Sequence, residues 1–131
     1  LDRVLFGGQI SQTRLAHYYH AADLYISASH SDGSSVSLME ALACGCPVIV
    51  SDIPGNREWI TPGVEGWLFP DGEHAALAEL IIAAAKTRQH LPEMSRAARS
   101  LAERRADWRV NFQKLLNAYE LAINFAKARK S

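Results

Sequence analysis

Apolar and polar positions follow two patterns along this chain, which together predict an α/β protein. Short and mostly apolar runs, typical of strands in a parallel sheet, occur at residues 1–7, 25–29, 47–51 and 67–69. Apolar residues at helical spacing predict helices at residues 11–22, 35–44, 73–87, 91–103 and 107–130. After the turn at Pro54-Gly55, Asn56 is expected to cap a short helix. The order predicts a three-layer αβα Rossmann-like parallel sheet that ends in helices from about residue 73 onward.

The composition suits one soluble domain over residues 1–131. The formal net charge is zero and 48% of the residues are hydrophobic, so charge gives no argument for binding nucleic acid. No apolar run approaches the ~18 residues of a transmembrane helix, and a cytoplasmic location is expected. Because Leu1 is not an initiator methionine, we expect the natural N-terminus to lie outside this sequence. Cys44 and Cys46 fit neither disulfide nor zinc spacing and are interpreted as small packing residues.

The loop between the second predicted strand and the next helix is the main candidate for a binding site. Its residues Asp32–Ser35 carry no large apolar side chain, and ligands of open α/β sheets bind outside the carboxyl ends of the strands. The helix that follows begins near Ser35, where free N–H groups and the helix dipole favour an anion. Glu40 lies five residues further on, about 7.5 Å along the axis. This span suits a diphosphate and its ribose, although geometry alone favours an ordinary solvated glutamate at this position.

The residues around this loop resemble the acid-x7-Glu motif of retaining glycosyltransferases. The similarity is to the large family-four group, glycosyl transferases group 1, which has the GT-B fold. Two positions depart from that pattern, since Asp32 replaces a glutamate and Ser34-Ser35 replaces Phe-Gly, so the identity of the donor sugar stays open. The resemblance rests on Asp32-Gly33-Ser34-Ser35-Val36-Ser37-Leu38-Met39-Glu40-Ala41-Leu42-Ala43-Cys44-Gly45, Pro47-Val48, Ser51-Asp52, Phe6-Gly7-Gly8, Ala22-Asp23, Gly63, Gly66-Trp67-Leu68 and Trp108.

The resemblance implies that the chain is the C-terminal, donor-binding domain of a retaining enzyme. Such an enzyme transfers a sugar from a nucleotide-diphosphate sugar to an acceptor. In the implied site, Asp32 and Glu40 are the catalytic carboxylates, which hold the donor sugar and the ribose. Arg57 is a weak candidate for a diphosphate contact. The implied donor-binding residues are Gly8 and Gln9 at the base, Asp32, Gly33, Ser34, Ser35 and Val36 at the sugar and phosphates, and Glu40 at the ribose.

The resemblance also implies partners. The donor is a substrate, and the family needs no metal ion or other cofactor, in agreement with the lack of an Asp-x-Asp motif. We expect an N-terminal acceptor domain in the same protein. A homodimer could form through an exposed sheet edge. The basic end, Lys127–Lys130, could contact the inner face of a membrane.

Two other functions remain open from the sequence, and a third is disfavoured by it. A non-catalytic module could bind a nucleotide-sugar or only a partner protein, and a GT-B-type epimerase could use the same pocket without an acceptor. A receiver or flavodoxin-like domain would share the layering, but it would leave Glu40 without a role.

Overall fold

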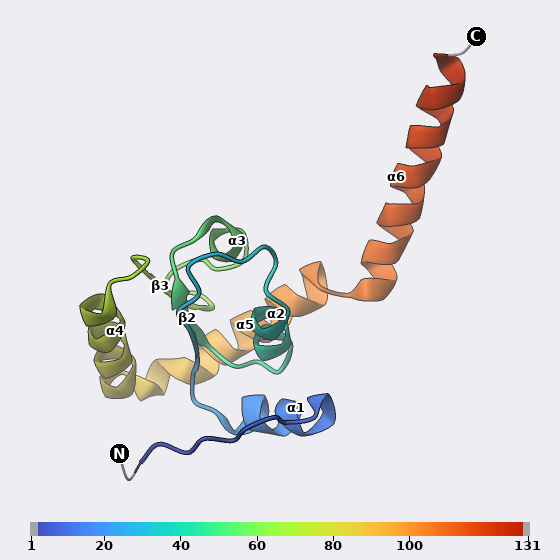
Figure 1. The fold of residues 1–131 in the computed structure, drawn as a ribbon. Helices are drawn as coiled ribbons and strands as arrows, with labels where there is room; N and C mark the ends of the chain where they lie inside the picture. Colours follow the sequence, from blue (N-terminus) through green and yellow to red (C-terminus); the bar gives the residue numbers. More distant parts are fainter. Residues whose placement is uncertain (1–2, 130–131) are drawn as a thin grey trace.

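A parallel sheet of three strands lies at the centre of the fold (Figure 1). The computed structural model describes residues 3–129. The strands β1 (Tyr25–Ser27) and β3 (Gly66–Phe69) both pair in parallel with β2 (Val48–Ser51), which lies between them. All four residues of β2 are buried, as its uninterrupted apolar sequence predicts for a central strand. The carboxyl ends of the three strands therefore meet at one edge of the sheet.

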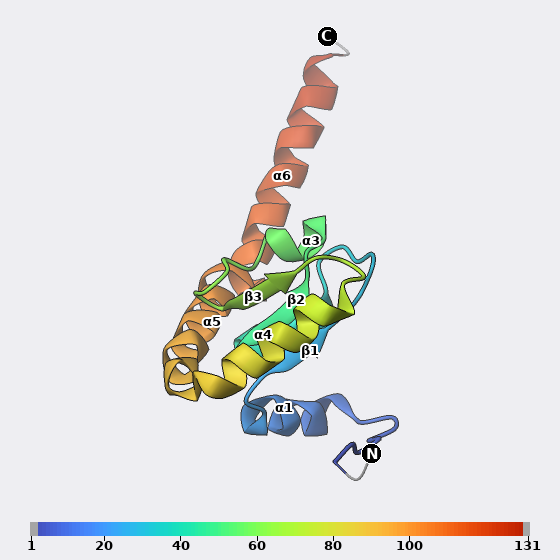
Figure 2. The same cartoon turned by 90° about the vertical axis from the view of Figure 1, so that its left-hand side faces the viewer.

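Helices cover both faces of this sheet, which confirms the predicted αβα layering (Figure 2). On one face lie α2 (Val36–Ala43) and α5 (Leu91–Arg105), with α1 (Gln12–Ala21) packed beside α2. The other face is covered by α4 (His74–Lys86). A 3₁₀ turn at Arg88–His90 joins α4 to α5. The larger core, on the α2 and α5 face, contains Leu38, Ala41, Leu42, Val48, Val50, Ala98 and Leu101.

The last helix, α6 (Trp108–Ala128), extends away from the body of the domain (Figure 1). Asp107 caps it, because its carboxylate accepts a hydrogen bond from the Arg109 amide at 2.9 Å. The predicted apolar stripe is present but exposed, and it includes Phe112, Leu115, Leu116, Tyr119 and Ile123. Within residues 3–129, none of the helices is long and apolar enough to cross a lipid bilayer.

Two predictions about local structure are wrong. Of the strand predicted at residues 1–7, residues 3–7 form no strand, and Leu1 and Asp2 lie outside the described residues. Leu5 and Phe6 are 95% and 92% exposed, so this segment gains neither a hydrogen-bonded neighbour nor a core. The short helix α3 (Pro54–Arg57) begins at its proline, so Asn56 is not its cap. Asn56 is instead buried within α3, where its Nδ2 donates to the carbonyl of Ser51 at 2.8 Å.

The pairing of β2 with β3 depends on a glycine. A Cβ atom on Gly66 would lie 1.9 Å from the carbonyl oxygen of Val48 and 2.8 Å from a methyl group of the same residue. Both contacts are far shorter than van der Waals distance, and the strands could relieve them only by separating. A side chain at this position is therefore incompatible with the observed sheet.

We predict that Gly66→Ala lowers the free energy of unfolding by at least about 2 kcal/mol, because the added methyl group overpacks a buried strand pair. Thermal or urea unfolding followed by circular dichroism would measure the change. Gly33→Ala is the matched control, since its Cβ meets no atom within 4 Å, and its unfolding free energy should change by less than about 0.5 kcal/mol. Equal stability of Gly66→Ala and the parent would contradict the close approach of the two strands.

Candidate functional site

The loop from residue 28 to residue 35, here called the β1–α2 loop, leaves the carboxyl edge of the sheet and leads to the tip of α2. Ser35 is the N-cap of α2, and its hydroxyl accepts a hydrogen bond from the Leu38 amide at 3.4 Å. In the described part of the chain, the amides of Val36 and Ser37 have no hydrogen-bond acceptor. Gly33, Ser34 and Val36 are exposed, so the tip of α2 is open to an anion.

Side chains behind the tip hold α2 in place. The hydroxyl of Tyr25, on β1, lies 2.8 Å from the hydroxyl of Ser37, which lies 3.1 Å from that of Ser35. Leu38 and Leu42 on the inner side of α2 are fully buried in the core. The free amides are therefore carried by a helix that is fixed to the sheet from both its polar and its apolar sides.

The β1–α2 loop contacts the segment after β2 at two places. The buried hydroxyl of Ser51 donates a hydrogen bond to the carbonyl of Ser29. Gly55, in α3, packs directly on the loop, because a Cβ atom there would lie 2.0 Å from the Gly33 carbonyl oxygen and 2.7 Å from that of Asp32. The glycine of the Pro54-Gly55 turn thus allows α3 to approach the backbone of the candidate site.

Glu40 lies on the side of α2 that faces α1, and its carboxylate does not enter the apolar core. Gln12 donates a hydrogen bond from Nε2 to Glu40 Oε1 at 3.1 Å. Both side chains line a cavity of about 200 Å³ between the two helices, together with Leu15, Ala16, Tyr19, Ala43 and Cys44. A carboxylate has room for further hydrogen bonds beside the one from Gln12, so Glu40 can accept hydroxyl groups of a ligand in this cavity.

The surroundings of the cavity also change the ionisation of Tyr19. Burial raises the pKa of Tyr19 to about 12, and the negative charge of Glu40 adds to this effect. The phenol is therefore neutral at physiological pH and can serve as a hydrogen-bond donor. Its ring stacks edge to face on Tyr25, with the ring centres 5.9 Å apart. Tyr19 thus connects the wall of the Glu40 cavity to the strand that supports the tip of α2.

The other residues that the sequence predicts for the site do not form one cluster with Glu40. Gly8 and Gln9 are exposed and lead into α1, at the end of that helix where Gln12 lies. Asp32 is exposed in the β1–α2 loop. Arg57 is already paired with another residue, because its guanidinium donates hydrogen bonds to both the carboxylate and the carbonyl of Asp52. Residues 32–36 do not line the Glu40 cavity, so the chain presents an open tip and a separate cavity further along α2.

Three residues at this edge were not singled out by the sequence patterns. Gln12 lies 28 residues before Glu40 along the chain, and no local spacing indicates that the two meet. His30 and Asp71 lie 41 residues apart, and His30 Nδ1 is 2.7 Å from Asp71 Oδ1. These contacts depend on how the loops of different strands converge, which only the folded chain reveals.

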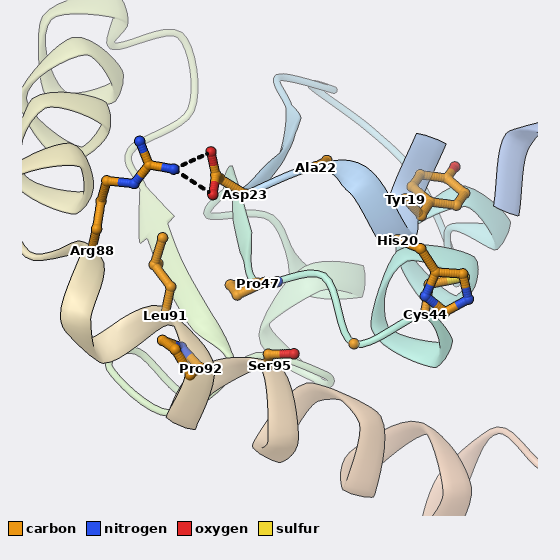
Figure 3. A pocket seen from close by; sticks show the side chains of 11 residues that line it. Tyr19, His20, Ala22, Asp23, Cys44, Pro47, Arg88, Leu91, Pro92 and Ser95 are labelled. Atoms are coloured by element: carbon orange, nitrogen blue, oxygen red, sulfur yellow. Dashed lines mark hydrogen bonds and ion pairs between the residues drawn. The ribbon is translucent and has the colours of Figure 1, made fainter. Parts of the chain in front are cut away.

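A second cavity, of about 440 Å³, lies near the amino ends of β1 and β2, opposite the edge described above (Figure 3). Asp23 and Arg88 form an ion pair across it, in which Arg88 Nη2 donates to both carboxylate oxygens of Asp23 at 2.8 Å. His20, Cys44 and Ser95 are among its other lining residues. Across residues 3–129, no three His, Cys, Asp or Glu side chains gather as a metal site.

Comparison with known families and proteins gives a consistent result. The family described as glycosyl transferases group 1 matches residues 1–101. Phosphatidyl-myo-inositol mannosyltransferase of Mycobacterium leprae is 34% identical over 122 residues, which are 92% of this chain and 32% of that protein. Amylovoran biosynthesis glycosyltransferase AmsK of Erwinia amylovora is 30% identical over 125 residues, which are 91% of this chain and 31% of that protein. The chain spans about a third of the length of these curated relatives.

Two solved structures have a similar fold. Sucrose-phosphate synthase from Thermosynechococcus elongatus aligns with a TM-score of 0.88 and 28% identity, covering 94% of this chain and 31% of that one. Anabaena Alr3699/HepE in complex with UDP-glucose aligns with a TM-score of 0.74 and 26% identity, covering 79% of this chain and 29% of that one.

The two cysteines should differ in reactivity, because only Cys44 reaches the cavities. Cys46 is 1% exposed and burial raises its pKa to about 11, whereas burial raises the pKa of Cys44 against an opposing effect of Arg99. Since the thiolate is the reactive form, we predict that iodoacetamide at pH 8 modifies Cys44 at least about ten-fold faster than Cys46. Peptide mass spectrometry would give both rates, with the unfolded chain as the control. Similar rates in the folded protein would contradict the burial of Cys46.

Proposed function

The chain belongs to the glycosyl transferases group 1 family, and on this premise we propose that it is the donor-binding part of a retaining glycosyltransferase. The enzyme would transfer a sugar from a nucleotide-diphosphate sugar to a glycan, a lipid or a small molecule. The observation that carries the proposal is the position of Glu40, whose carboxylate lines a cavity on the same helix whose tip is open to an anion. The spacing between them, about 7.5 Å, suits a ribose and its diphosphate.

Each group in the proposed site has one task. The amides at the tip of α2, from Ser34 to Val36, would donate hydrogen bonds to the diphosphate and stabilise the negative charge that develops as it departs. Glu40 would accept hydrogen bonds from the ribose hydroxyls, while Asp32 would orient the hydroxyls of the transferred sugar. Backbone atoms of Gly8 and Gln9 would lie against the base.

We further propose that no metal ion takes part. Helix amides and positive side chains would supply the stabilisation that a metal ion gives in other transferases. Because Arg57 is paired with Asp52, the cationic contacts to the diphosphate would come from a part of the protein outside this chain. That UDP and UDP-glucose are bound in structures of similar fold supports a nucleotide-sugar as the ligand.

The acceptor would be bound by an N-terminal domain of the same protein. The exposed apolar stripe of α6 supports this partner, because an unpaired stripe of this length on a soluble helix normally packs against another surface.

A homodimer through the free edge of β1 is a second proposed contact. We place the protein in the cytoplasm, where Lys127 and its neighbours could touch a membrane; Lys130 lies outside the described residues.

Replacing the proposed ribose ligand should weaken donor binding. We predict that Glu40→Gln costs about 1.5–3 kcal/mol of binding free energy, roughly a ten-fold loss or more, because hydrogen bonds to a charged carboxylate become bonds to a neutral amide. Calorimetry on the full-length protein would measure the affinity for the nucleotide-sugar that stabilises it most in a thermal-shift panel. Glu79→Gln, an exposed substitution on α4, is the matched control and should leave the affinity unchanged. Unchanged affinity in Glu40→Gln would remove the ribose role.

The transferase function itself is tested by comparing the full-length protein with the isolated chain. We expect the full-length protein to convert a nucleotide-sugar and an acceptor into a glycoside, and the isolated chain to form none. Binding without transfer by the full-length protein would favour the non-catalytic module. Interconversion of nucleotide-sugars without an acceptor would favour the epimerase.

A further inference from the structure

The carboxyl edge of the sheet carries one contact between side chains of two distant loops. His30 follows β1 and Asp71 follows β3, which are the two outer strands of the sheet. His30 Nδ1 lies 2.7 Å from Asp71 Oδ1, so the pair reaches across the end of β2. The two side chains are 77% and 39% exposed. The pair therefore ties the β1–α2 loop to the turn that leads into α4 without being part of the core.

The other contacts of the β1–α2 loop are of a different kind. Ser51 donates a hydrogen bond to the carbonyl of Ser29, whose hydroxyl lies 3.2 Å from that of Ser27, and Gly55 packs against the backbone at residues 32 and 33. Between these two points, His30 is the residue that holds the loop by its side chain. Asp32 lies two residues further along and has no hydrogen bond of its own within the described residues, so its position depends on how the loop is held.

We propose that His30 and Asp71 are positioning residues for the donor sugar, which hold Asp32 where it meets the sugar hydroxyls. This inference rests on the proposed function, in which Asp32 contacts the transferred sugar. The imidazole N–H donates to the carboxylate and is restrained by it, and the restraint is passed along two residues of backbone. In this arrangement the pair would touch neither donor nor acceptor, so its effect on the reaction would be indirect.

The two halves of the donor would be held by different parts of the chain. Of the amides that would hold the diphosphate, that of Val36 belongs to α2, and those of Ser34 and Ser35 lie directly before it. Ser35 caps α2 and its hydroxyl lies 3.1 Å from that of Ser37, while α2 itself is fixed by buried Leu38 and Leu42 and by the Tyr25–Ser37 hydrogen bond. Loss of the His30–Asp71 pair leaves those contacts intact. It should therefore lower the affinity contributed by the sugar and leave the affinity for the nucleoside diphosphate unchanged, whereas general damage to the fold would lower both.

Binding measurements with two ligands test this distinction. Calorimetry on the full-length protein would compare a nucleoside diphosphate with its glucose or mannose ester, after a panel of UDP, GDP and ADP compounds has identified the base. In His30→Ala and in Asp71→Ala, we expect the Kd of the nucleotide-sugar to rise about three- to five-fold, as suits the loss of one exposed hydrogen bond to a carboxylate. The Kd of the nucleoside diphosphate should stay the same. The double variant should lose no more than either single variant, since the pair acts as a unit.

Two further variants separate positioning from stability. In His30→Asn, the amide nitrogen can take the place of Nδ1 and donate to Asp71, so nucleotide-sugar binding should recover most of the loss. Arg88→Ala breaks the Asp23–Arg88 pair, which is similarly exposed but lies at the opposite edge of the sheet, and it should leave both ligands unaffected.

Several results would overturn the inference. Equal weakening of both ligands, no change in the nucleotide-sugar, additive losses in the double variant, or no recovery in His30→Asn would each show that the pair does not position the sugar. A parent protein that binds none of the compounds would overturn the proposed function itself, which keeps the two failures apart.

Discussion

The end of β2 is the point on which the candidate site depends. Ser51, the last residue of this buried strand, is inaccessible to solvent and bonds to segments on both sides of it. Its hydroxyl donates to the β1–α2 loop at Ser29, and its carbonyl accepts from Asn56 in α3. One residue thus fixes both the loop that carries Asp32 and the helix that packs on that loop. Because the strands are parallel, the loops that follow them all lie at the same edge of the sheet, and Ser51 links two of these segments.

The layers of the fold, and most of its elements, could be predicted from the sequence. The pattern of apolar residues located β1, β2, β3 and the helices α1, α2, α4, α5 and α6, since each helix buries a regular apolar face or, in α6, carries one. The strand predicted at residues 1–7 failed because an apolar run becomes a strand only beside a hydrogen-bonding neighbour. The cap predicted at Asn56 failed because Pro54 had already started the helix, which left the amide of Asn56 free to bond to Ser51.

The candidate site could be predicted only as far as its local motif extends. The open tip of α2 and the outward position of Glu40 follow from residues 32–40 and the pitch of a helix. The cavity beside Glu40 does not, because Gln12 and Tyr19 come from a helix whose position is set by packing against α2. Nor does the His30–Asp71 pair, which requires the loops of the two outer strands to meet. Contacts between distant segments therefore supply the part of the site that local patterns omit.

The two ends of the proposed donor are consequently held with different stiffness. The tip of α2 is part of a helix whose inner side chains are fully buried, so any displacement of its amides would disturb the core. The β1–α2 loop, in contrast, is held by the buried hydroxyl of Ser51, the Ser27–Ser29 hydroxyl contact, the close approach of Gly55 and the exposed His30–Asp71 hydrogen bond. An exposed pair contributes only up to about 1 kcal/mol, so residues around it can change without unfolding the domain. If the proposed donor site is correct, a substitution in the loop would alter the selection of the sugar at little cost to stability, whereas a change in the helix tip proposed to bind the diphosphate would also destabilise the fold.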